Sequence, residues 1–267
     1  MEKETRLTGG AARAMARPRK MNRRPRRPRV VRAAAVLFGT LAAAPFPAAA
    51  QCEAFWQPRL LAQAESAQVE LRDNRRAAAT IPTRWFIAVS HINKRINAAS
   101  GVDAQFLLCS STEPNAFAWR SDGAPVVALT LGMYRLLGDD WHAYAAILGH
   151  ENAHLARRHG NKRQQREAVS ALGQLLGGAL LANSGGGALV AESLSIGGRA
   201  ITSSYSREEE HEADLDGMHY AQAAGFDPRG ALSFHAKVKS AGHFLGSHPS
   251  SADRMRRLRA ELKRKGW

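Results

Sequence analysis

The chain of 267 residues is long enough for one domain of ordinary size with its own hydrophobic core. Its formal net charge of +15 would suit a polyanion-binding protein, but residues 1–32 alone hold twelve Lys and Arg against two Glu. The other 235 residues carry 26 basic and 21 acidic groups, a nearly balanced body for which we expect no nucleic-acid partner.

The N-terminus has the three parts of a secretory signal peptide. A basic region up to Arg32 is followed by the apolar run 33–44, and small residues up to Ala50 allow cleavage there. The run of about a dozen apolar residues is too short to span a bilayer, which needs roughly twenty. We predict a basic N-terminus and signal peptide over residues 1–50, a single domain over 51–267, and a periplasmic or secreted protein. Two alternatives stay open: an unstructured basic arm before a buried helix, and membrane association through an uncleaved N-terminal segment.

Two cysteines, Cys52 and Cys109, remain in the part of the chain predicted to be exported. An oxidising compartment would allow one disulfide between them. Because spacing alone does not show that two residues are close in space, two unpaired thiols are an equal alternative.

Hydrophobic periodicity predicts helices and one small sheet in the first half of the domain. Residues 54–79 have an Ala-rich helical composition, and apolar residues recur at helical spacing from Thr83 to Gly101. Three short apolar runs separated by turn residues then indicate strands, at 104–110, 115–120 and 125–130.

A helix is predicted to follow the sheet. Asp139 or Asp140 can cap its N-terminus, and Gly160-Asn161 can end it. Residues 168–200 beyond it are rich in Gly, Ala and Leu without clear charge periodicity. They are interpreted as a glycine-hinged lid, as a peripheral membrane contact, or as a helical hairpin packed on the core.

The C-terminal part adds three further helices. Ser206 and Glu209 form a capping box that starts a helix ending at Ala224. The Asp-Pro pair at 227–228 starts the next helix, and the segment 250–253 starts a basic C-terminal helix. With one small sheet among these helices, the predicted fold class is α+β and mostly helical.

The segment His150-Glu151-Asn152-Ala153-His154 carries the clearest chemical signal. Side chains four residues apart lie on the same face of a helix, so the two imidazoles can bind one metal ion, at about 2.0–2.1 Å for zinc. The glutamate is then placed beside a water that the metal activates, as in zinc peptidases with the H-E-x-x-H motif. Chance would produce this pattern only about 0.02 times in such a chain. The alternative is a solvated, histidine-rich helix turn.

A catalytic zinc ion needs three protein ligands and an open position, so a third ligand should come from elsewhere in the chain. The acidic helix predicted after Ser206 is the best source, because Glu210 can reach the zinc while Asp214 supports a ligand histidine. An alternative is a solvated acidic helix N-terminus, which the helix dipole favours. Three neighbouring carboxylates are alternative candidates for the third zinc ligand: Glu208, Glu209 and Glu212.

The chain resembles the HtpX and CAAX-prenyl-protease type of zinc peptidases, family M48, and more closely the soluble exported members of that family. The resemblance covers roughly Pro114 to Leu258, and it is carried by PNAFAW (114–119), ILGHENAHLARRH (147–159), YSREEEHEADLDGMHYAQAAGFDP (205–228) and SHPSSADRMRRL (247–258). It implies a zincin fold of the gluzincin type. By this match the zinc ligands are His150, His154 and Glu210, the general base is Glu151, and the aspartate supporting a ligand is Asp214.

Two departures from the family pattern matter. Asn152 stands where the family usually has an apolar residue, which affects helix packing beside the site but removes no ligand. The transmembrane helices of the integral-membrane members have no counterpart in this sequence, which favours a soluble or peripheral enzyme.

Stabilising the oxyanion of a tetrahedral intermediate needs a further polar group, for which His248, Tyr205 and His211 are candidates. The resemblance implies that the loop of His248 neighbours the site. His248 is therefore interpreted in three ways: as a catalytic residue that stabilises the oxyanion, as a group that blocks the open zinc position until substrate displaces it, or as an ordinary loop histidine. Tyr205 is interpreted as a packing residue.

The resemblance also implies an extended substrate that pairs along a sheet edge, with the runs 115–119 or 125–130 as the candidate edge. The leading interpretation is a zinc metalloendopeptidase of a bacterial-type cell envelope, acting on polypeptides in the quality control of exported or membrane proteins. Zn²⁺ is its cofactor, and a peripheral membrane contact and the oligomeric state stay open. The alternative is a non-proteolytic periplasmic folding or assembly factor with a regulatory metal site.

Overall fold

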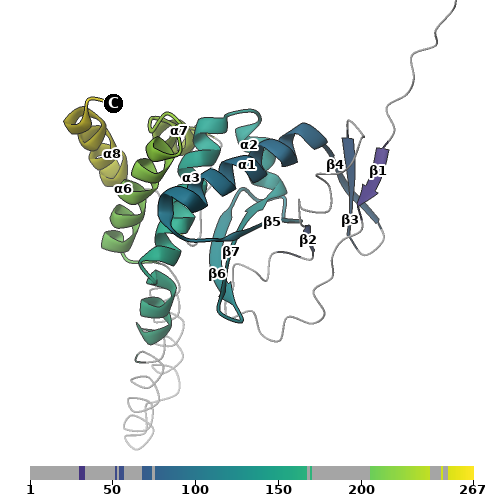
Figure 1. Ribbon diagram of the computed structural model, residues 1–267, viewed down its shortest axis with the longest axis horizontal. Helices are drawn as coiled ribbons and strands as arrows, with labels where there is room; N and C mark the ends of the chain where they lie inside the picture. Colours follow the sequence, from purple (N-terminus) through teal and green to yellow (C-terminus); the bar gives the residue numbers. More distant parts are fainter. Residues whose placement is uncertain are drawn as a thin grey trace, which may run out of the picture.

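The computed structural model of the protein describes residues 30–33, 52, 54–56, 68–73, 76–166, 169, 205–240, 248 and 252–267. The predicted signal peptide apart from 30–33, and the predicted lid or hairpin at 168–200 apart from Val169, lie outside these residues. The described helices gather around one face of a small sheet, which confirms the α+β, mostly helical fold (Figure 1).

The main sheet has four strands in the order β2-β5-β7-β6. Their bounds are β2 Phe55–Trp56, β5 Gln105–Cys109, β6 Ala116–Ser121 and β7 Ala124–Thr130. β7 pairs in parallel with β5 and antiparallel with β6, so the three predicted strands are confirmed. Among the described strands β6 lies at an edge and β7 lies inside the sheet, which rules out 125–130 as the free edge.

A second, three-stranded sheet includes two strands, β3 and most of β4, from the stretch 54–79 that was predicted to be helical. It has the order β1-β3-β4, with β1 Val30–Ala33, β3 Gln68–Asp73 and β4 Arg76–Pro82. The helix prediction for 54–79 is therefore wrong for the residues of that range that the structure describes, 54–56, 68–73 and 76–79. Val69 and Leu71 are fully buried, while the residues between and after them are more exposed, which is the period of two that a strand requires. Burial of alternate side chains here overrides the helical preference of the alanines.

The helices around the main sheet follow from local signals that the structure largely confirms. Pro82 precedes α1 (Thr83–Ser100), and Gly101 ends it with a φ of 71°. The short helix α2 (Leu131–Leu137) was not predicted, since seven residues are too few for a clear helical period. Asp140 caps α3 (Trp141–Ala156) by accepting a hydrogen bond from the N–H of Ala143.

The end of α3 differs from the prediction. The helix ends at Ala156, and Arg158 then takes a left-handed conformation with a φ of 54°. A separate helical segment follows at 159–166, so Gly160 lies within it rather than ending α3. The break turns His159 back toward α3, which matters for the site described below.

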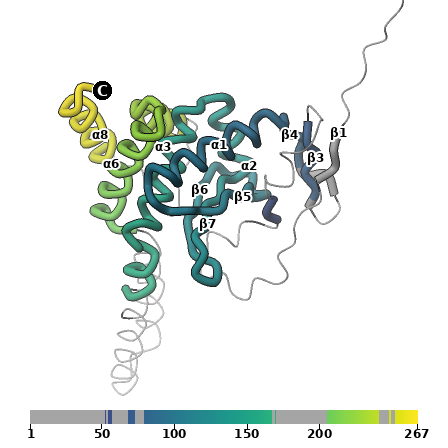
Figure 2. Tube along the Cα trace, in the orientation of Figure 1, coloured from purple at the N-terminus to yellow at the C-terminus, as the bar shows by residue number. Residues whose placement is uncertain are grey.

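Three helices complete the described domain: α6 Arg207–Ala223, α7 Gly230–Ser240 and α8 Ala252–Lys265. The predicted capping box is present, because Ser206 and Glu209 each accept a hydrogen bond from the other's backbone N–H. Figure 2 shows α8, in yellow, beside α6 and on the side of the molecule away from the sheet.

The core lies between the main sheet and helices α1 and α3. Alternate strand residues such as Leu108 and Leu129 face these helices and join one hydrophobic cluster with them. Within this cluster the buried Trp85 of α1 donates a hydrogen bond of 3.0 Å to the Tyr144 hydroxyl of α3. Burial of both large rings, with the indole N–H satisfied, fixes α3 against α1.

The opposite face of the main sheet carries a smaller apolar cluster and a disulfide. Cys52 and Cys109 are bonded, which decides between the two alternatives that the sequence left open. The bond ties the segment before β2 to β5, next to Phe55 and Trp119. Within the described residues no helix combines the length and the apolar character needed to cross a membrane.

Two glycines set the distance between α3 and α6. A Cβ atom on Gly149 would lie 2.6 Å from the carbonyl oxygen of Gly217, and one on Gly217 would lie 2.6 Å from the backbone nitrogen of His150. Neither position tolerates a side chain without moving a helix. The backbones therefore cross in direct contact, one residue before the first histidine of the H-E-x-x-H motif.

Candidate metal centre

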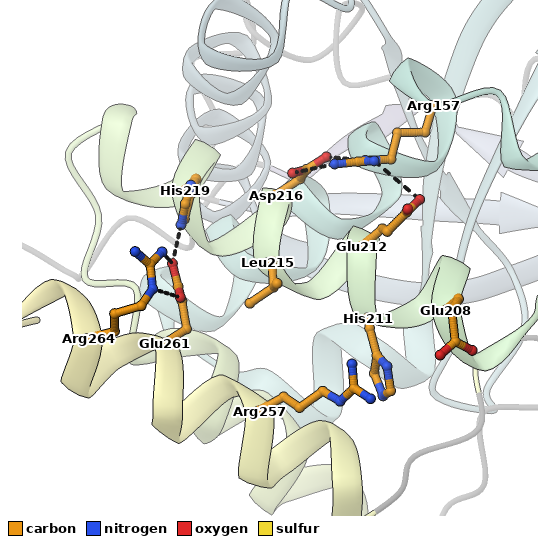
Figure 3. A pocket seen from close by; sticks show the side chains of 10 residues that line it. All are labelled: Arg157, Glu208, His211, Glu212, Leu215, Asp216, His219, Arg257, Glu261 and Arg264. Atoms are coloured by element: carbon orange, nitrogen blue, oxygen red, sulfur yellow. Dashed lines mark hydrogen bonds and ion pairs between the residues drawn. The ribbon is translucent and has the colours of Figure 1, made fainter.

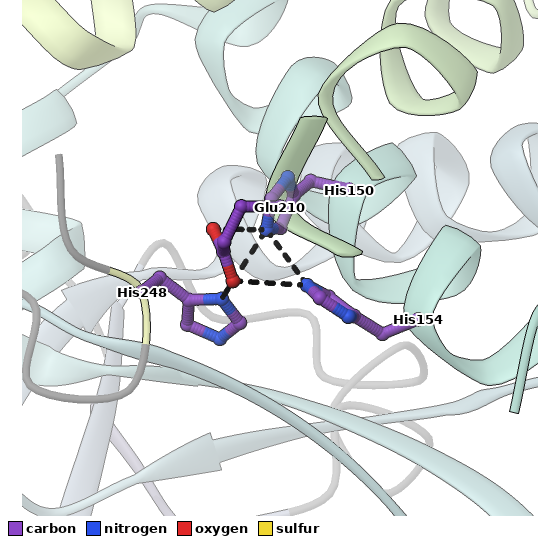
Figure 4. A group of neighbouring side chains, drawn as sticks. All are labelled: His150, His154, Glu210 and His248. Carbon is purple, nitrogen blue, oxygen red and sulfur yellow. Dashed lines mark hydrogen bonds and ion pairs between the residues drawn. The ribbon is translucent and has the colours of Figure 1, made fainter. Parts of the chain in front are cut away.

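Four side chains from separate parts of the fold converge beside this helix crossing (Figure 4). His150 and His154 project from α3, Glu210 from the first turn of α6, and His248 from the chain before α8. One potential ligand atom from each lies within 4.8 Å of the other three, and all four residues are buried. The sequence prediction that α3 and the acidic helix meet at one site is consistent with this geometry.

The separations between these atoms suit one tetrahedral metal ion. Ligand atoms about 2.0–2.1 Å from a tetrahedral zinc lie about 3.3 Å from one another. The Nε2 atoms of His150 and His154 are 3.0 Å apart, and His150 Nε2 lies 3.3 Å from His248 Nδ1. Glu210 Oε1 lies 3.5 Å from His154 Nε2 and 2.8 Å from His248 Nδ1. Three imidazoles and one carboxylate form a donor set of the kind that zinc prefers.

The environment of His154 favours the neutral imidazole that a metal requires. Burial lowers the pKa of His154 well below its ordinary value, although the hydrogen bond to Glu210 opposes the shift. Tyr205 stacks on the imidazole with the ring centroids 3.8 Å apart and the planes 20° from parallel. Tyr205 thus packs against a candidate ligand, as its interpretation from sequence proposed.

Asp214 supports the other histidine of the motif. Its Oδ1 lies 3.0 Å from His150 Nδ1, so the Nδ1–H can donate to the carboxylate while Nε2 faces the cluster. Burial alone would raise the pKa of Asp214, but hydrogen bonds and charge from Arg254 hold it well below its ordinary value. Asp214 stands where the sequence interpretation put it, on the same face of α6 as Glu210.

Arg254 links α8 to both carboxylates of α6. This buried guanidinium donates to Asp214 at 2.6 and 2.7 Å, and its Nη1 lies 2.6 Å from Glu210 Oε2. A buried arginine paired in this way fixes the orientation of both carboxylates. Burial alone would raise the pKa of Glu210, but the charge of His248 and further hydrogen bonds hold it well below its ordinary value.

Glu151 lies beside the cluster and not within it. Its Oε1 is 3.4 Å from His248 Nε2, and its buried Oε2 has no hydrogen-bond partner among the residues that the structure describes. Burial raises the pKa of Glu151, against the opposing charges of His248 and His150. A buried carboxylate oxygen without a partner suits a group that accepts a proton from a small molecule entering the site.

The competing carboxylates have other partners. Glu209 accepts two hydrogen bonds of 2.8 Å from Arg166 and closes the capping box. Glu212 lies 3.1 Å from His159 Nε2, and Glu208 lines a surface pocket of about 350 Å³ between α6 and α8 (Figure 3). None of the three belongs to the four-residue group, so Glu210 alone of these acids faces the two histidines.

His211 also lies away from the cluster. Its Nε2 is 3.1 Å from Asp253, and it lines the same pocket between α6 and α8 (Figure 3). His248, in contrast, is buried among the candidate ligands, so the reading of it as an ordinary loop histidine does not fit the geometry.

Comparison with known proteins agrees with this arrangement. The model of peptidase family M48 matches residues 88–262. The chain belongs to peptidase family M48. It is 30% identical over 151 residues to the "Beta-barrel assembly-enhancing protease" of Escherichia coli (strain K12), with 54% of this chain and 30% of that protein covered. The same values hold for the protein of that name in Shigella flexneri.

A second M48 relative comes from a eukaryote. The "Mitochondrial metalloendopeptidase OMA1" of Schizosaccharomyces pombe is 31% identical over 179 residues, which is 64% of this chain and 51% of that protein. The chain therefore spans about a third to a half of the length of these curated relatives. The residues matched by the family model, 88–262, include both the H-E-x-x-H helix α3 and the acidic helix α6.

A pocket of about 170 Å³ lies next to the candidate metal centre of this M48 domain, between β6 and the end of α3. Its strand side is formed by Ala118, Trp119 and Arg120, and its other side includes His154 and Tyr205. The pocket thus joins the edge strand β6 to a candidate metal ligand. Of the two predicted substrate edges, only the run 115–119 fits this position.

Several site residues of the M48 domain were not found from sequence. Arg254 lies in the SHPSSADRMRRL segment, which is far along the chain from the acidic helix, so the sequence does not indicate that Arg254 contacts that helix. The contact between Gly149 and Gly217 could not be predicted, because a glycine within a helix can be present for several different reasons. Asn152 was identified from sequence as a polar residue at a position that is usually apolar in the family. Its buried side-chain amide donates a hydrogen bond of 3.3 Å to the side-chain oxygen of Asn97, which links α3 to α1.

Proposed function

We propose that this M48 domain is a zinc-dependent metalloendopeptidase that hydrolyses peptide bonds. The observation that carries the proposal is the convergence of three imidazoles and one carboxylate, with the buried Glu151 beside them. The metalloendopeptidase relative and the protease relative support the same class of activity. Three donors from α3 and α6, with the buried carboxylate of Glu151 beside them, fit a catalytic zinc site, provided that the fourth donor, His248, leaves its position when substrate enters.

His150, His154 and Glu210 are proposed to hold the zinc ion, with Asp214 and Arg254 orienting the first and last of them. When bound, zinc supplies a Lewis acid that lowers the pKa of water and polarises the peptide carbonyl. Glu151 is proposed to accept a proton at Oε2 and to deliver it to the leaving amine.

His248 is proposed to contribute the fourth donor of the resting site. Its Nδ1 lies 3.3 Å from His150 Nε2 and its Nε2 lies 3.4 Å from Glu151 Oε1, so it stands between the ligands and the base. A substrate carbonyl needs that space. In this proposal His248 moves aside when substrate enters, and stabilising the oxyanion is a role that it takes only after that movement.

The proposed substrates are extended polypeptides that pair with β6, an edge strand among the strands that the structure describes. An edge strand offers unpaired N–H and C=O groups to a chain laid beside it, whatever the sequence of that chain. The pocket next to β6 and His154 is the proposed place for one substrate side chain. Main-chain pairing with one side-chain pocket suits an enzyme that accepts many unfolded proteins.

The proposed setting is a bacterial-type cell envelope, where the enzyme acts in quality control of exported or membrane proteins. The signal-peptide pattern and the disulfide between Cys52 and Cys109 support an oxidising compartment. The name of the Escherichia coli relative, which refers to β-barrel assembly, supports a role near envelope proteins.

Metal removal tests the proposed activity. Protein stripped by a chelator is expected to hydrolyse unfolded casein at less than about a hundredth of the original rate, because the Lewis acid supplies several kcal/mol of transition-state stabilisation. One equivalent of Zn²⁺ per chain should restore the rate, whereas Mg²⁺ should not. Undiminished hydrolysis by protein shown to be metal-free by elemental analysis would contradict the proposal.

A further inference from the structure

On the side of its ring that faces away from the cluster, His154 contacts a second histidine, whereas His150 contacts the carboxylate of Asp214 there. Its Nδ1 lies 2.9 Å from Nδ1 of His159, and Nε2 of His159 lies 3.1 Å from Glu212 Oε2 on α6. The His159 side chain is fully buried, while 44% of the Glu212 side chain is exposed. The chain of contacts therefore runs from the metal cluster through two buried rings to a carboxylate at the surface.

The contact between the two imidazoles fixes where their protons lie once a metal is bound. If Nε2 of His154 faces the metal as a lone pair, its proton must be on Nδ1. That N–H can donate only if Nδ1 of His159 is unprotonated, which places the proton of His159 on Nε2. From Nε2 it can donate to Glu212. With this one arrangement of protons, every ring nitrogen of His154 and His159 has a partner.

We propose that His159 is a positioning residue for the metal centre, accepting the Nδ1–H of His154 and so holding that imidazole in the tautomer and orientation that binds zinc. The inference rests on the proposed zinc site. It assigns His154 a support as specific as the one that Asp214 gives His150.

The surroundings of His159 hold it in this place. The left-handed residue Arg158 turns the chain after α3 so that the next residue points back toward His154. Arg157 contacts Glu212 at 3.2 Å and Asp216 through two hydrogen bonds, which fixes Glu212 at the far end of the series.

Two substitutions separate a hydrogen-bond role from a packing role. In His159→Asn the side-chain oxygen is bonded to Cγ, as Nδ1 is in histidine, so it can still accept from His154. In His159→Gln the polar atoms lie one bond further out, near the position of Nε2, so they can reach Glu212 but not His154. Glutamine fills more of the cavity than asparagine does, so a packing role predicts the reverse order of effects.

Zinc affinity of the full-length protein, measured by competition with a chromophoric chelator, is the readout. We expect His159→Gln to weaken zinc binding about 10- to 100-fold and His159→Asn to weaken it no more than about 3-fold. His219→Gln is a matched control, because His219 also contacts a glutamate, Glu261 at 2.8 Å, but away from the cluster. Its zinc affinity should equal that of the unchanged protein.

Equal weakening by Asn and Gln, or greater weakening by Asn, would overturn the role of His159. If the unchanged protein binds no zinc, the proposed function fails and the inference fails with it. Should either variant not fold, the long-range ¹H–¹⁵N spectrum of the zinc-loaded, unchanged protein decides. We expect His154 protonated at Nδ1 and His159 at Nε2, and the opposite tautomer of His159 would reject the inference.

Discussion

Replacing Glu151 with glutamine should lower kcat for casein hydrolysis about 10²- to 10⁴-fold, which is the range for loss of one general acid–base group. Glutamine keeps the size of the side chain and can still contact His248, but it cannot take a proton from water. The Oε2 atom of Glu151, which has no hydrogen-bond partner within the described part of the chain, is the atom whose chemistry changes. Because the residue lies outside the four-donor group, the variant should still bind one zinc ion per chain.

The control for this variant is Glu113→Gln, which changes an exposed glutamate outside the cluster and should leave kcat unchanged. The same comparison separates the enzyme from a folding or assembly factor, since a factor that only binds unfolded chains would lose nothing in Glu151→Gln. A Glu151→Gln protein that keeps more than a tenth of the activity would remove Glu151 from the role of general base.

The second large effect is expected at the helix crossing. In Gly217→Ala the new Cβ would lie 2.6 Å from the backbone nitrogen of His150 and 2.9 Å from its Cα, so α3 and α6 must separate. Overpacking of this kind costs about 1–3 kcal/mol in unfolding free energy. The separation also moves Glu210 away from the two histidines, because Glu210 is carried by the same helix. We expect zinc affinity to fall at least about tenfold, as when support of a metal ligand is lost.

Denaturant unfolding and chelator competition measure the two effects of Gly217→Ala. At an uncrowded helix position, replacing glycine with alanine would instead stabilise the fold by about 0.5–1 kcal/mol. Gln222→Ala introduces an alanine at an exposed position of the same helix and is the control. It should change neither the free energy of unfolding nor the zinc affinity. A Gly217→Ala protein with unchanged or higher stability and unchanged zinc affinity would show that the close crossing does not position the site.

The histidine pair was predictable from sequence because its geometry is local. His150 and His154 share a helix, and the spacing of four fixes which face they occupy. Glu210 was harder to predict, because three neighbouring carboxylates were also possible ligands. Its spacing of four from Asp214 favoured it, and the family resemblance indicated the same residue. The structure shows the physical difference: the competitors are engaged by Arg166 or His159 or lie toward solvent, whereas Glu210 faces inward.

The parts that sequence did not reveal depend on contacts between distant segments. Residues 54–79 look helical by composition, yet Val69 and Leu71 alternate into a core that only the sheet supplies. His159 ends the segment ILGHENAHLARRH, but no role could be predicted for it. The left-handed turn at Arg158, which brings His159 back to His154, cannot be read from the sequence. Nothing in the residues around Arg254 indicates that it reaches across to α6.

The central claim is that residues from α3 and α6 together hold one zinc ion, and elemental analysis of Glu210→Gln beside the unchanged protein tests it most directly. Glutamine retains the size of Glu210 but is a poor zinc ligand. Glu208→Gln, an exposed position in the same helical turn, is the matched control. We predict one zinc per chain in the unchanged protein and in Glu208→Gln, and substoichiometric zinc in Glu210→Gln after dialysis against a weak chelator. A full equivalent of zinc retained by Glu210→Gln would contradict the account.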